Sequence, residues 1–269
     1  MKKYIFGWCC VLLLALAATA SLNAQGNGSQ GNPGISPPNA KPHGLSYGEW
    51  SARWWQWAFS IPKSVNPLVY DDAPCGVMQT GNVWFLAGKG FGASGAGIRN
   101  CTIPSGTSLF FPVINSVWDD TEVDPGTGAL SWDTFTPNQL RDMLKANLDT
   151  TVVSFSCFID GKQVRGLDSI LTTPYRVQSP VFSYTLPSTL VPRDNLLGVD
   201  FSLWTAPPPP LPSTPTGTVP WVVADGVFLM LEPLAPGIHT IYFTGTFSYG
   251  FAFDITYTVD VLPRGQFKK

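Results

Sequence analysis

The sequence carries little charge and almost no histidine. Only 13% of its 269 residues are charged, 16 Lys and Arg stand against 18 Asp and Glu, and there are 2 His. A chain without a basic excess lacks the attraction that nucleic acid requires, so we expect no nucleic-acid partner. The hydrophobic fraction of 44% is too high for a mainly disordered chain, because it supplies enough apolar surface for a core.

The two histidines also argue against common hydrolase chemistry. His43 lies in an irregular N-terminal segment, and His239 alternates within a strand-like stretch, so neither has an identifiable catalytic partner. Residues 92–96 read Gly-Ala-Ser-Gly-Ala, which lacks the last glycine of a nucleophile elbow, and no helix follows. No histidine pair has zinc-ligand spacing. We therefore predict no catalytic residue, no metal site and no cofactor.

Residues 1–24 have the features of a cleavable secretory signal peptide. Lys2 and Lys3 precede an apolar run that ends in small residues before Ala24. The run is shorter than the roughly 20 apolar residues of a spanning helix, so an uncleaved membrane anchor is the weaker alternative. We predict a secreted or periplasmic bacterial protein with no membrane span after signal cleavage.

Three cysteines remain after removal of the leader, and export would place them where a disulfide persists. Cys75 and Cys101 flank a Gly-rich stretch between two apolar runs, so we prefer their pairing, which would close a short loop at one end of a sheet. Cys157 shares the alternation of Val153 and Phe155 and is expected to be a buried free thiol. A catalytic thiol is the weaker alternative, because nucleophilic cysteines need an exposed, electropositive setting.

Alternating apolar and polar residues, together with 26 Gly and 25 Pro, predict a β-rich fold. Residues 251–261 alternate without a break and form a hairpin with residues 237–244, and Asp160 with Gly161 is typical of a two-residue hairpin turn. Further strands are expected at 83–87, 109–114, 152–159, 163–167, 182–186, 197–204 and 227–231. We predict an all-β fold, an antiparallel β-sandwich of jelly-roll or immunoglobulin-like type with two accessory α-helices.

Two irregular segments bear on domain organisation. Residues 25–45 lack apolar periodicity and predict a flexible lead-in. Residues 205–220 are rich in proline and predict an extended surface loop. The segment after this loop is near the lower size limit for an independent domain, so residues 46–269 are expected to form one domain, with a two-domain split as the weaker alternative.

The two predicted helices each begin with a capping box, one at Thr136 and Gln139 and one at Ser46 and Glu49. The second helix, over residues 46–61, has apolar residues on well over half of its circumference. It should therefore be clasped on two sides or line a groove. Its apolar stripe comprises Tyr47, Trp50, Trp54, Trp57 and Ile61, and its polar stripe comprises Glu49, Arg53, Gln56 and Ser60.

The edge of this polar stripe is the predicted ligand-binding site. Its residues are Glu49, Arg53, Trp55, Gln56 and Phe59. An exposed flat aromatic face beside hydrogen-bonding side chains suits a sugar or another amphiphilic ligand. In the alternative interpretation the aromatic residues are core, and Glu49 with Arg53 is a surface pair of only about 0.3–0.5 kcal/mol.

An acidic loop follows at residues 119–126. Asp120, Glu122 and Asp124 offer alternate oxygen donors, as at the start of a calcium loop. The loop lacks the later bidentate glutamate and has proline where an EF-hand has glycine, so a solvated acidic turn is the preferred interpretation.

Several blocks of the sequence resemble a family of exported bacterial proteins with a Trp-rich helix and no known activity. They are residues 47–57, 83–88, 101–106, 109–112, 159–161, 175–177, 225–226 and 236–241. The resemblance covers most of the mature chain and implies a single secreted domain with a Cys75 to Cys101 bridge. It carries over no catalytic residue.

These observations favour a secreted, non-catalytic binding or surface-associated module whose partner is a carbohydrate or an envelope polymer. Two alternatives stay open. One is a carboxylate-dependent polysaccharide hydrolase or lyase that uses Glu49, Arg53 and the acidic loop. The other is a structural envelope protein.

Overall fold

The computed structural model describes residues 32–188, 190–263 and 265–266. The predicted signal peptide therefore lies outside the described residues. Within them, most regular structure is β-strand, and the two α-helices are α1 (Tyr47–Ser60) and α2 (Pro137–Thr151). The prediction of an all-β fold with two accessory helices is confirmed. Neither helix of this part of the chain has the length and apolar character needed to cross a membrane.

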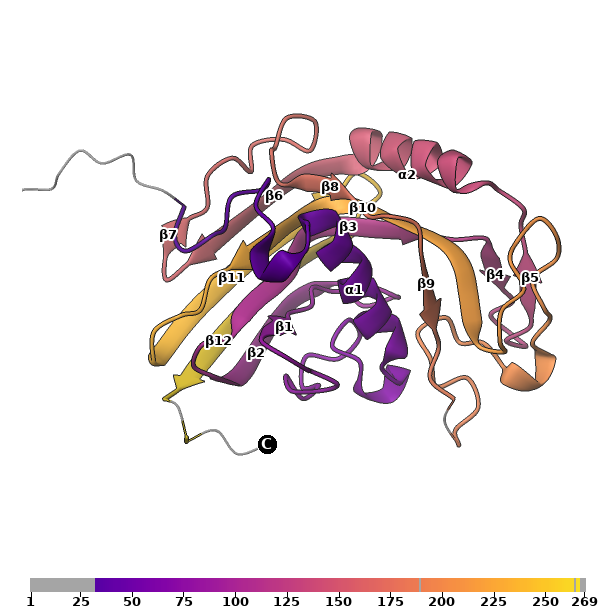
Figure 1. Cartoon of the computed structure of the whole chain (residues 1–269), viewed down its shortest axis with the longest axis horizontal. Helices are drawn as coiled ribbons and strands as arrows, with labels where there is room; N and C mark the ends of the chain where they lie inside the picture. The colour runs from indigo at the N-terminus through magenta and orange to yellow at the C-terminus, as the bar shows by residue number, and fades with distance from the viewer. Residues whose placement is uncertain (1–31, 189, 264, 267–269) are drawn as a thin grey trace, which may run out of the picture. The chain divides into compact units, whose positions relative to one another are not determined.

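The strands form two five-stranded sheets and one small sheet (Figure 1). Sheet A has the order β1 (Val83–Phe85), β3 (Ser108–Trp118), β10 (Thr218–Leu231) and β8 (Arg176–Gln178), and β9 (Phe182–Thr185) also pairs with β10. Sheet B has the order β2 (Gly95–Pro104), β12 (Ala252–Leu262), β11 (Gly237–Phe247), β6 (Val152–Ile159) and β7 (Lys162–Gln163). The small sheet pairs β4 (Thr121–Val123) with β5 (Leu130–Trp132), and three short 3-10 helices are η1 (Pro42–Gly44), η2 (Lys63–Val65) and η3 (Phe201–Leu203).

Both large sheets are mixed, which corrects the prediction of antiparallel strands throughout. β1 runs parallel to β3, and β2 runs parallel to β12, whereas the other pairs are antiparallel. Parallel neighbours need a longer connection than a hairpin. The chain therefore leaves sheet A after β1, forms β2 in sheet B and returns to sheet A with β3. The jelly-roll or immunoglobulin-like sandwich topology stays a prediction.

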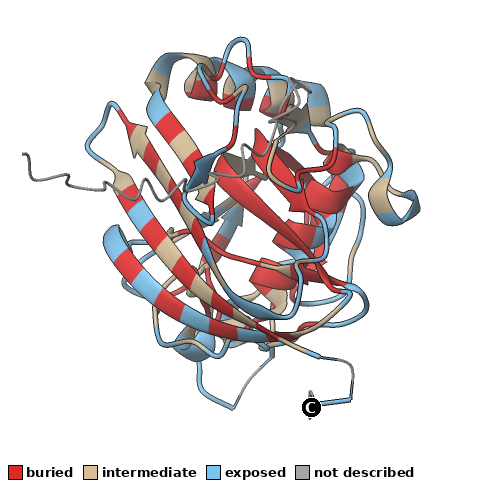
Figure 2. Ribbon diagram, turned by 90° about the vertical axis from the view of Figure 1, so that its left-hand side faces the viewer, coloured by how far each residue is buried: buried red, intermediate tan, exposed pale blue. Residues whose placement is uncertain are grey.

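Sheet A is packed on both faces. Phe110 of β3 contacts Tyr47 of α1 with ring centroids 5.9 Å apart, and the next residue, Phe111, stacks at 5.3 Å on Phe243 of β11. The central strands of sheet A are therefore apolar on both sides. Figure 2 shows this contrast, because β10 is buried along almost its whole length whereas β12 alternates between buried and less buried residues.

Helix α1 is built as the sequence predicts. The Ser46 hydroxyl accepts the Glu49 N–H, and the Glu49 carboxylate accepts the Ser46 N–H at 2.8 Å, which completes the capping box. All its aromatic side chains are buried. Trp54 is fully buried and donates its indole N–H to the Leu86 carbonyl at 2.9 Å. The predicted clasp on two sides therefore consists of sheet A and the chain segment that leads into and out of β1.

The predicted disulfide between Cys75 and Cys101 is present and ties the segment before β1 to β2. Cys157 of β6 is buried and has a free thiol, as expected. Burial raises the pKa of the Cys157 thiol, which removes the thiolate that nucleophilic catalysis needs.

The predicted irregular segments are shorter than expected. Residues 32–45 contact the sheets, because Ile35 forms a bridge with Leu231 and the Ser36 N–H donates to the Met230 carbonyl. The proline-rich segment ends at Thr218, where β10 begins. The strand predicted at residues 197–204 is wrong, since this segment forms turns and η3.

The hairpin turn at Asp160 and Gly161 is confirmed, with φ angles of 49° and 75°. The Asp160 carboxylate accepts from the Thr240 N–H at 2.8 Å and lies 2.7 Å from His239 Nδ1, and His239 Nε2 faces the Ala235 carbonyl at 2.9 Å. Burial lowers the pKa of His239, but the bonds to Asp160 and Ala235 outweigh it and the pKa is raised. Burial raises the pKa of Asp160, but the hydrogen bonds from His239 and the Thr240 N–H, together with the nearby positive charges, outweigh it and the pKa is lowered.

This pair predicts a pH-dependent stability. A raised histidine pKa stabilises the fold below about pH 6.5 and the effect is lost as pH rises through the folded pKa, whereas the Asp160 contribution is lost in acid. We expect His239→Gln to lower the free energy of unfolding by about 0.5 kcal/mol more near pH 5.5 than near pH 8.5, a small effect because solvent screens the pair. Urea denaturation of both proteins at the two pH values measures it, and equal differences would contradict it.

Candidate functional site

Two hollows flank α1, and the predicted site residues are divided between them. Trp55 and Phe59 line a cavity of about 500 Å³, called here the aromatic cavity. Arg53 and Gln56 line a groove of about 690 Å³, called here the α1 groove. Glu49 lines neither hollow. The five predicted residues therefore do not form one continuous site.

Trp55 and Phe59 are walls of the cavity rather than surface residues. Their exposed fractions are 5% and 1%, which corrects the expectation that one of them is exposed. Glu49 is exposed and its carboxylate serves the capping box, and the bonds from Ser46 hold the pKa of Glu49 below its ordinary value. Gln56 donates to the Ser183 carbonyl at 2.8 Å.

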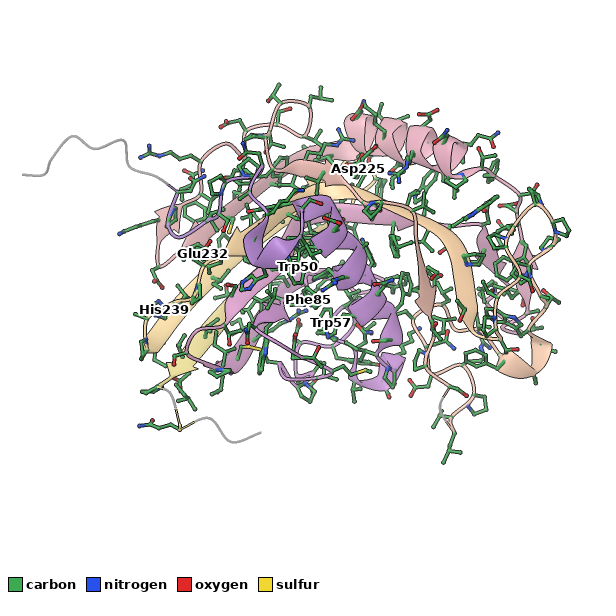
Figure 3. The ribbon with its side chains drawn as sticks, in the orientation of Figure 1. Trp50, Trp57, Phe85, Asp225, Glu232 and His239 are labelled. Carbon is green, nitrogen blue, oxygen red and sulfur yellow. A yellow bond between two sulfur atoms is a disulfide. The ribbon has the colours of Figure 1, made fainter. Side chains whose placement is uncertain are left out.

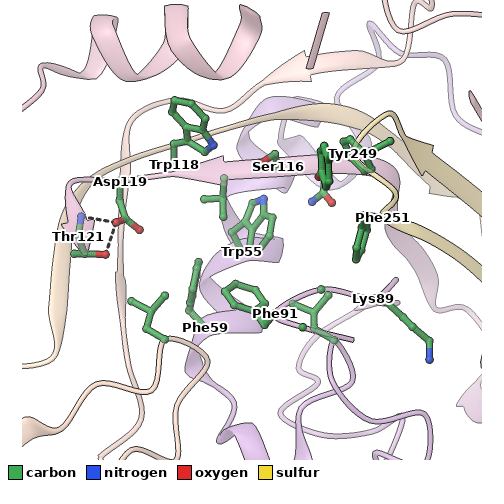
Figure 4. Close-up of a pocket in the computed structure, with 17 residues that line it drawn as sticks. Trp55, Phe59, Lys89, Phe91, Ser116, Trp118, Asp119, Thr121, Tyr249 and Phe251 are labelled. Atoms are coloured by element: carbon green, nitrogen blue, oxygen red, sulfur yellow. Dashed lines mark hydrogen bonds between the residues drawn. The ribbon is translucent and has the colours of Figure 1, made fainter. Parts of the chain in front are cut away.

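Four chain segments supply most of the lining of the aromatic cavity, and Leu68 and Leu197 complete it (Figure 4). The four segments are the second half of α1, the loop at residues 89–92, the end of β3 with the residues after it, and the tip of the β11–β12 hairpin at residues 247–251. The ring of Phe59 contacts Trp55 at 5.5 Å and Phe91 at 5.7 Å between centroids. Seven of the 17 residues that line the cavity are aromatic.

A bulge in β3 decides which side chains of that strand reach the cavity. Phe228 pairs with Pro112 and Val227 with Ile114, so Val113 has no partner and the alternation shifts by one residue. Phe111 and Ile114 consequently both face sheet B.

After the bulge, Asn115 lies opposite Gly226, where a Cβ atom would come within 2.5 Å of the Asn115 backbone. Glycine thus permits the close approach of the two strands. Asn115 and Asp119 both line the cavity. Alternation along the sequence cannot predict that Asn115 and Asp119 face the cavity, because nothing in the sequence reveals the extra residue of the bulge.

The charged groups at the aromatic cavity already have protein partners. Asp119 accepts from the Thr121 N–H at 2.8 Å and from the Tyr184 hydroxyl at 2.8 Å. Burial nevertheless raises the pKa of Asp119, because its cost exceeds the gain from these hydrogen bonds. Lys89 pairs with Asp71 at 2.7 Å. The cavity therefore offers a ligand no unpaired charge.

Two buried N–H donors at the cavity have no protein acceptor. They are Trp55 Nε1 and Asn115 Nδ2, which are two of the three buried side-chain polar atoms without a partner in the described residues. The other indoles of α1 all donate to carbonyls, namely those of Pro42, Leu86 and Val77. An unsatisfied buried donor costs about 1–3 kcal/mol. Both atoms are almost closed to solvent, so a ligand acceptor would recover that cost once the neighbouring side chains shift to admit it.

The remaining candidates do not converge on a site. Asp120 is buried and accepts the Phe135 N–H, Asp124 accepts from its own turn, and Glu122 is exposed. The described residues contain no group of three or more His, Cys, Asp or Glu placed to hold a metal ion. His43 lies 3.0 Å from the Ser108 hydroxyl and lines the α1 groove.

Comparisons with protein families, with curated proteins and with solved structures gave no match to this chain. Its function therefore has to be inferred from the residues described above.

Proposed function

We propose that this chain is an exported, non-catalytic binding module whose aromatic cavity holds an uncharged saccharide. The observation that carries the proposal is the pair of buried, unpartnered donors, Trp55 Nε1 and Asn115 Nδ2, in an aromatic wall. A sugar supplies hydroxyl oxygens as acceptors and an apolar ring face for contact with the aromatic rings.

Charge and size support the same ligand class. Asp119 and Lys89 are both engaged by protein groups, so a charged ligand would find no free counter-charge in the cavity. Burial of an unpaired charge is unfavourable. The volume of about 500 Å³ lies in the usual range of small-ligand pockets, which is roughly 300–1,000 Å³. A small saccharide or the end of a polymer chain fits these conditions.

The hydrolase alternative has one observation in its favour, the raised pKa of Asp119. Glycoside hydrolysis requires a second carboxyl group across the bond that breaks. Asp119 is the single carboxylic acid among the described residues that line the aromatic cavity, and Glu49 lies outside it. The cavity therefore supports binding better than hydrolysis.

Trp55→Phe tests the proposal, because it keeps an aromatic ring and removes the N–H donor. We expect it to weaken the binding of a neutral saccharide about three- to tenfold, as for one lost hydrogen bond. Isothermal titration with a panel of neutral oligosaccharides measures the change.

The matched control is Trp132→Phe, whose indole N–H donates to the Thr205 carbonyl and which lines neither hollow. It should lower stability but leave saccharide affinity within about twofold, since a lost internal hydrogen bond costs about 1 kcal/mol. Equal affinities of wild type and Trp55→Phe, or no saccharide binding by wild type, would refute the proposal.

A further inference from the structure

The α1 groove has an aromatic floor whose polar atoms are already used. Phe85 of β1 lies between Trp50 and Trp57 of α1 (Figure 3), with its ring centroid 6.2 Å from that of Trp50 and 5.5 Å from that of Trp57. Both indole N–H groups donate to backbone carbonyls. Trp50 and Trp57 are 6% and 7% exposed and Phe85 is partly buried, so the floor offers a ligand a small apolar ring surface and no free polar atom of the indoles.

Arg53 is the one fully charged side chain among the described residues that line this groove. Its guanidinium carbon lies 5.3 Å from the centroid of the Trp50 ring, a cation–π position. Within the described part of the chain it makes no ion pair and no hydrogen bond. The carboxylate of Glu49, one helical turn earlier, accepts hydrogen bonds from the Ser46 N–H and hydroxyl instead of pairing with Arg53. Arg53 thus retains a planar fork of donors with no internal acceptor.

The neighbouring strand edge is closed to an added peptide strand. β1 is the outermost strand of sheet A. The Gln79 side chain accepts the Phe85 N–H at 2.9 Å and donates to the Phe85 carbonyl at 2.7 Å. Peptides that extend a sheet need such edge groups free. The groove therefore favours a ligand recognised through a ring and an acid group over a peptide.

We propose that the α1 groove binds a uronic-acid residue of an acidic polysaccharide, with the carboxylate on Arg53 and the sugar ring on the aromatic floor. A guanidinium fork and a carboxylate match in a bidentate geometry, and the groove lining contains no carboxylate that would repel the ligand. This assignment rests on the proposed saccharide-binding function and adds to it a second site with a preference for acidic sugars.

The test compares an oligogalacturonate with its methyl ester, which has the same rings without the charge. We expect wild type to bind the acid about tenfold more tightly than the ester at low salt, and this preference should shrink at high salt. Arg53→Gln should abolish the preference, and Arg53→Lys should restore only part of it because lysine lacks the fork.

Arg141→Gln is the matched control, since it removes an equal charge from α2, away from the groove. It should leave the acid-to-ester ratio unchanged. An equal affinity for acid and ester, or an equal loss with Arg141→Gln, would overturn the inference.

Wild type could instead bind polyglutamate but not the oligogalacturonate, with the polyglutamate binding lost in Arg53→Gln. That result would assign the groove to an acidic peptide and would also overturn the inference. The proposed function has its own contradicting results, which do not involve Arg53. They are no binding of neutral saccharides by wild type, or the same affinity for them in wild type and Trp55→Phe.

Discussion

Asp225→Ala is expected to lower the free energy of unfolding by about 3–5 kcal/mol, the cost of breaking a buried ion pair by removing one of its members. Asp225 of β10 is 1% exposed and accepts from Arg176 Nε at 2.8 Å and Arg176 Nη2 at 2.9 Å. Arg176 of β8 also donates to Asp149 of α2. The carboxylate therefore anchors a network that joins sheet A to α2, and Figure 3 shows Asp225 below that helix.

Guanidinium denaturation at neutral pH measures the change. Lys145→Ala is the control, because Lys145 pairs with the same Asp149 on the helix surface but is 57% exposed. An exposed pair of this spacing contributes about 0.3–0.5 kcal/mol. If Asp225→Ala cost no more than Lys145→Ala, the buried network would not stabilise the fold as described.

Trp54→Ala is expected to lower the free energy of unfolding by about 3–5 kcal/mol as well, because it removes the largest fully buried side chain of α1. Trp54 is fully buried, and its ring contacts Trp55 at 4.8 Å, Trp57 at 5.9 Å and Phe228 of β10 at 6.4 Å. The substitution also leaves the Leu86 carbonyl without its donor. Helix α1 should then detach more easily from sheet A.

The comparison is Trp204→Ala, a partly buried tryptophan that packs on Phe201 and Trp132 outside the two large sheets. Its loss should cost about half as much or less, since the energy lost depends on the buried area removed. Thermal unfolding followed by near-UV circular dichroism reports both variants. Equal effects would mean that α1 is not the principal aromatic contact of sheet A.

Features with a local cause could be predicted from the sequence. The two capping boxes, the Asp160–Gly161 turn and the β11–β12 hairpin each depend on residues that are close in the chain, and the structure contains all of them. The Cys75–Cys101 disulfide was also predicted.

Features set by distant partners could not be predicted. β2 begins at Gly95, inside a stretch that reads as a flexible glycine-rich loop, and it is a strand because ten of its residues pair with β12. Pro220 lies inside β10, where the register shifts between Val219 and Val222 leave room for a residue without an N–H. Neither effect has a local signal.

In the candidate site, too, the features with a local cause could be predicted and those set by distant partners could not. Helical spacing correctly placed Trp55 and Phe59 next to each other on α1, but only sheet A and the β11–β12 hairpin make that surface one wall of a cavity. Asn115 and Asp119 join it through the β3 bulge. The sequence therefore indicated the helix that carries the site but not the side chains opposite it.

The most direct measurement is a titration of ¹⁵N-labelled protein with a neutral saccharide, observed at the indole N–H resonances. The Trp55 resonance, assigned by its loss in Trp55→Phe, should move downfield as the N–H gains an acceptor, while those of Trp50, Trp54 and Trp57 should change little because they already donate to carbonyls. A Trp55 resonance that stays in place while the saccharide saturates the protein would contradict binding in the aromatic cavity.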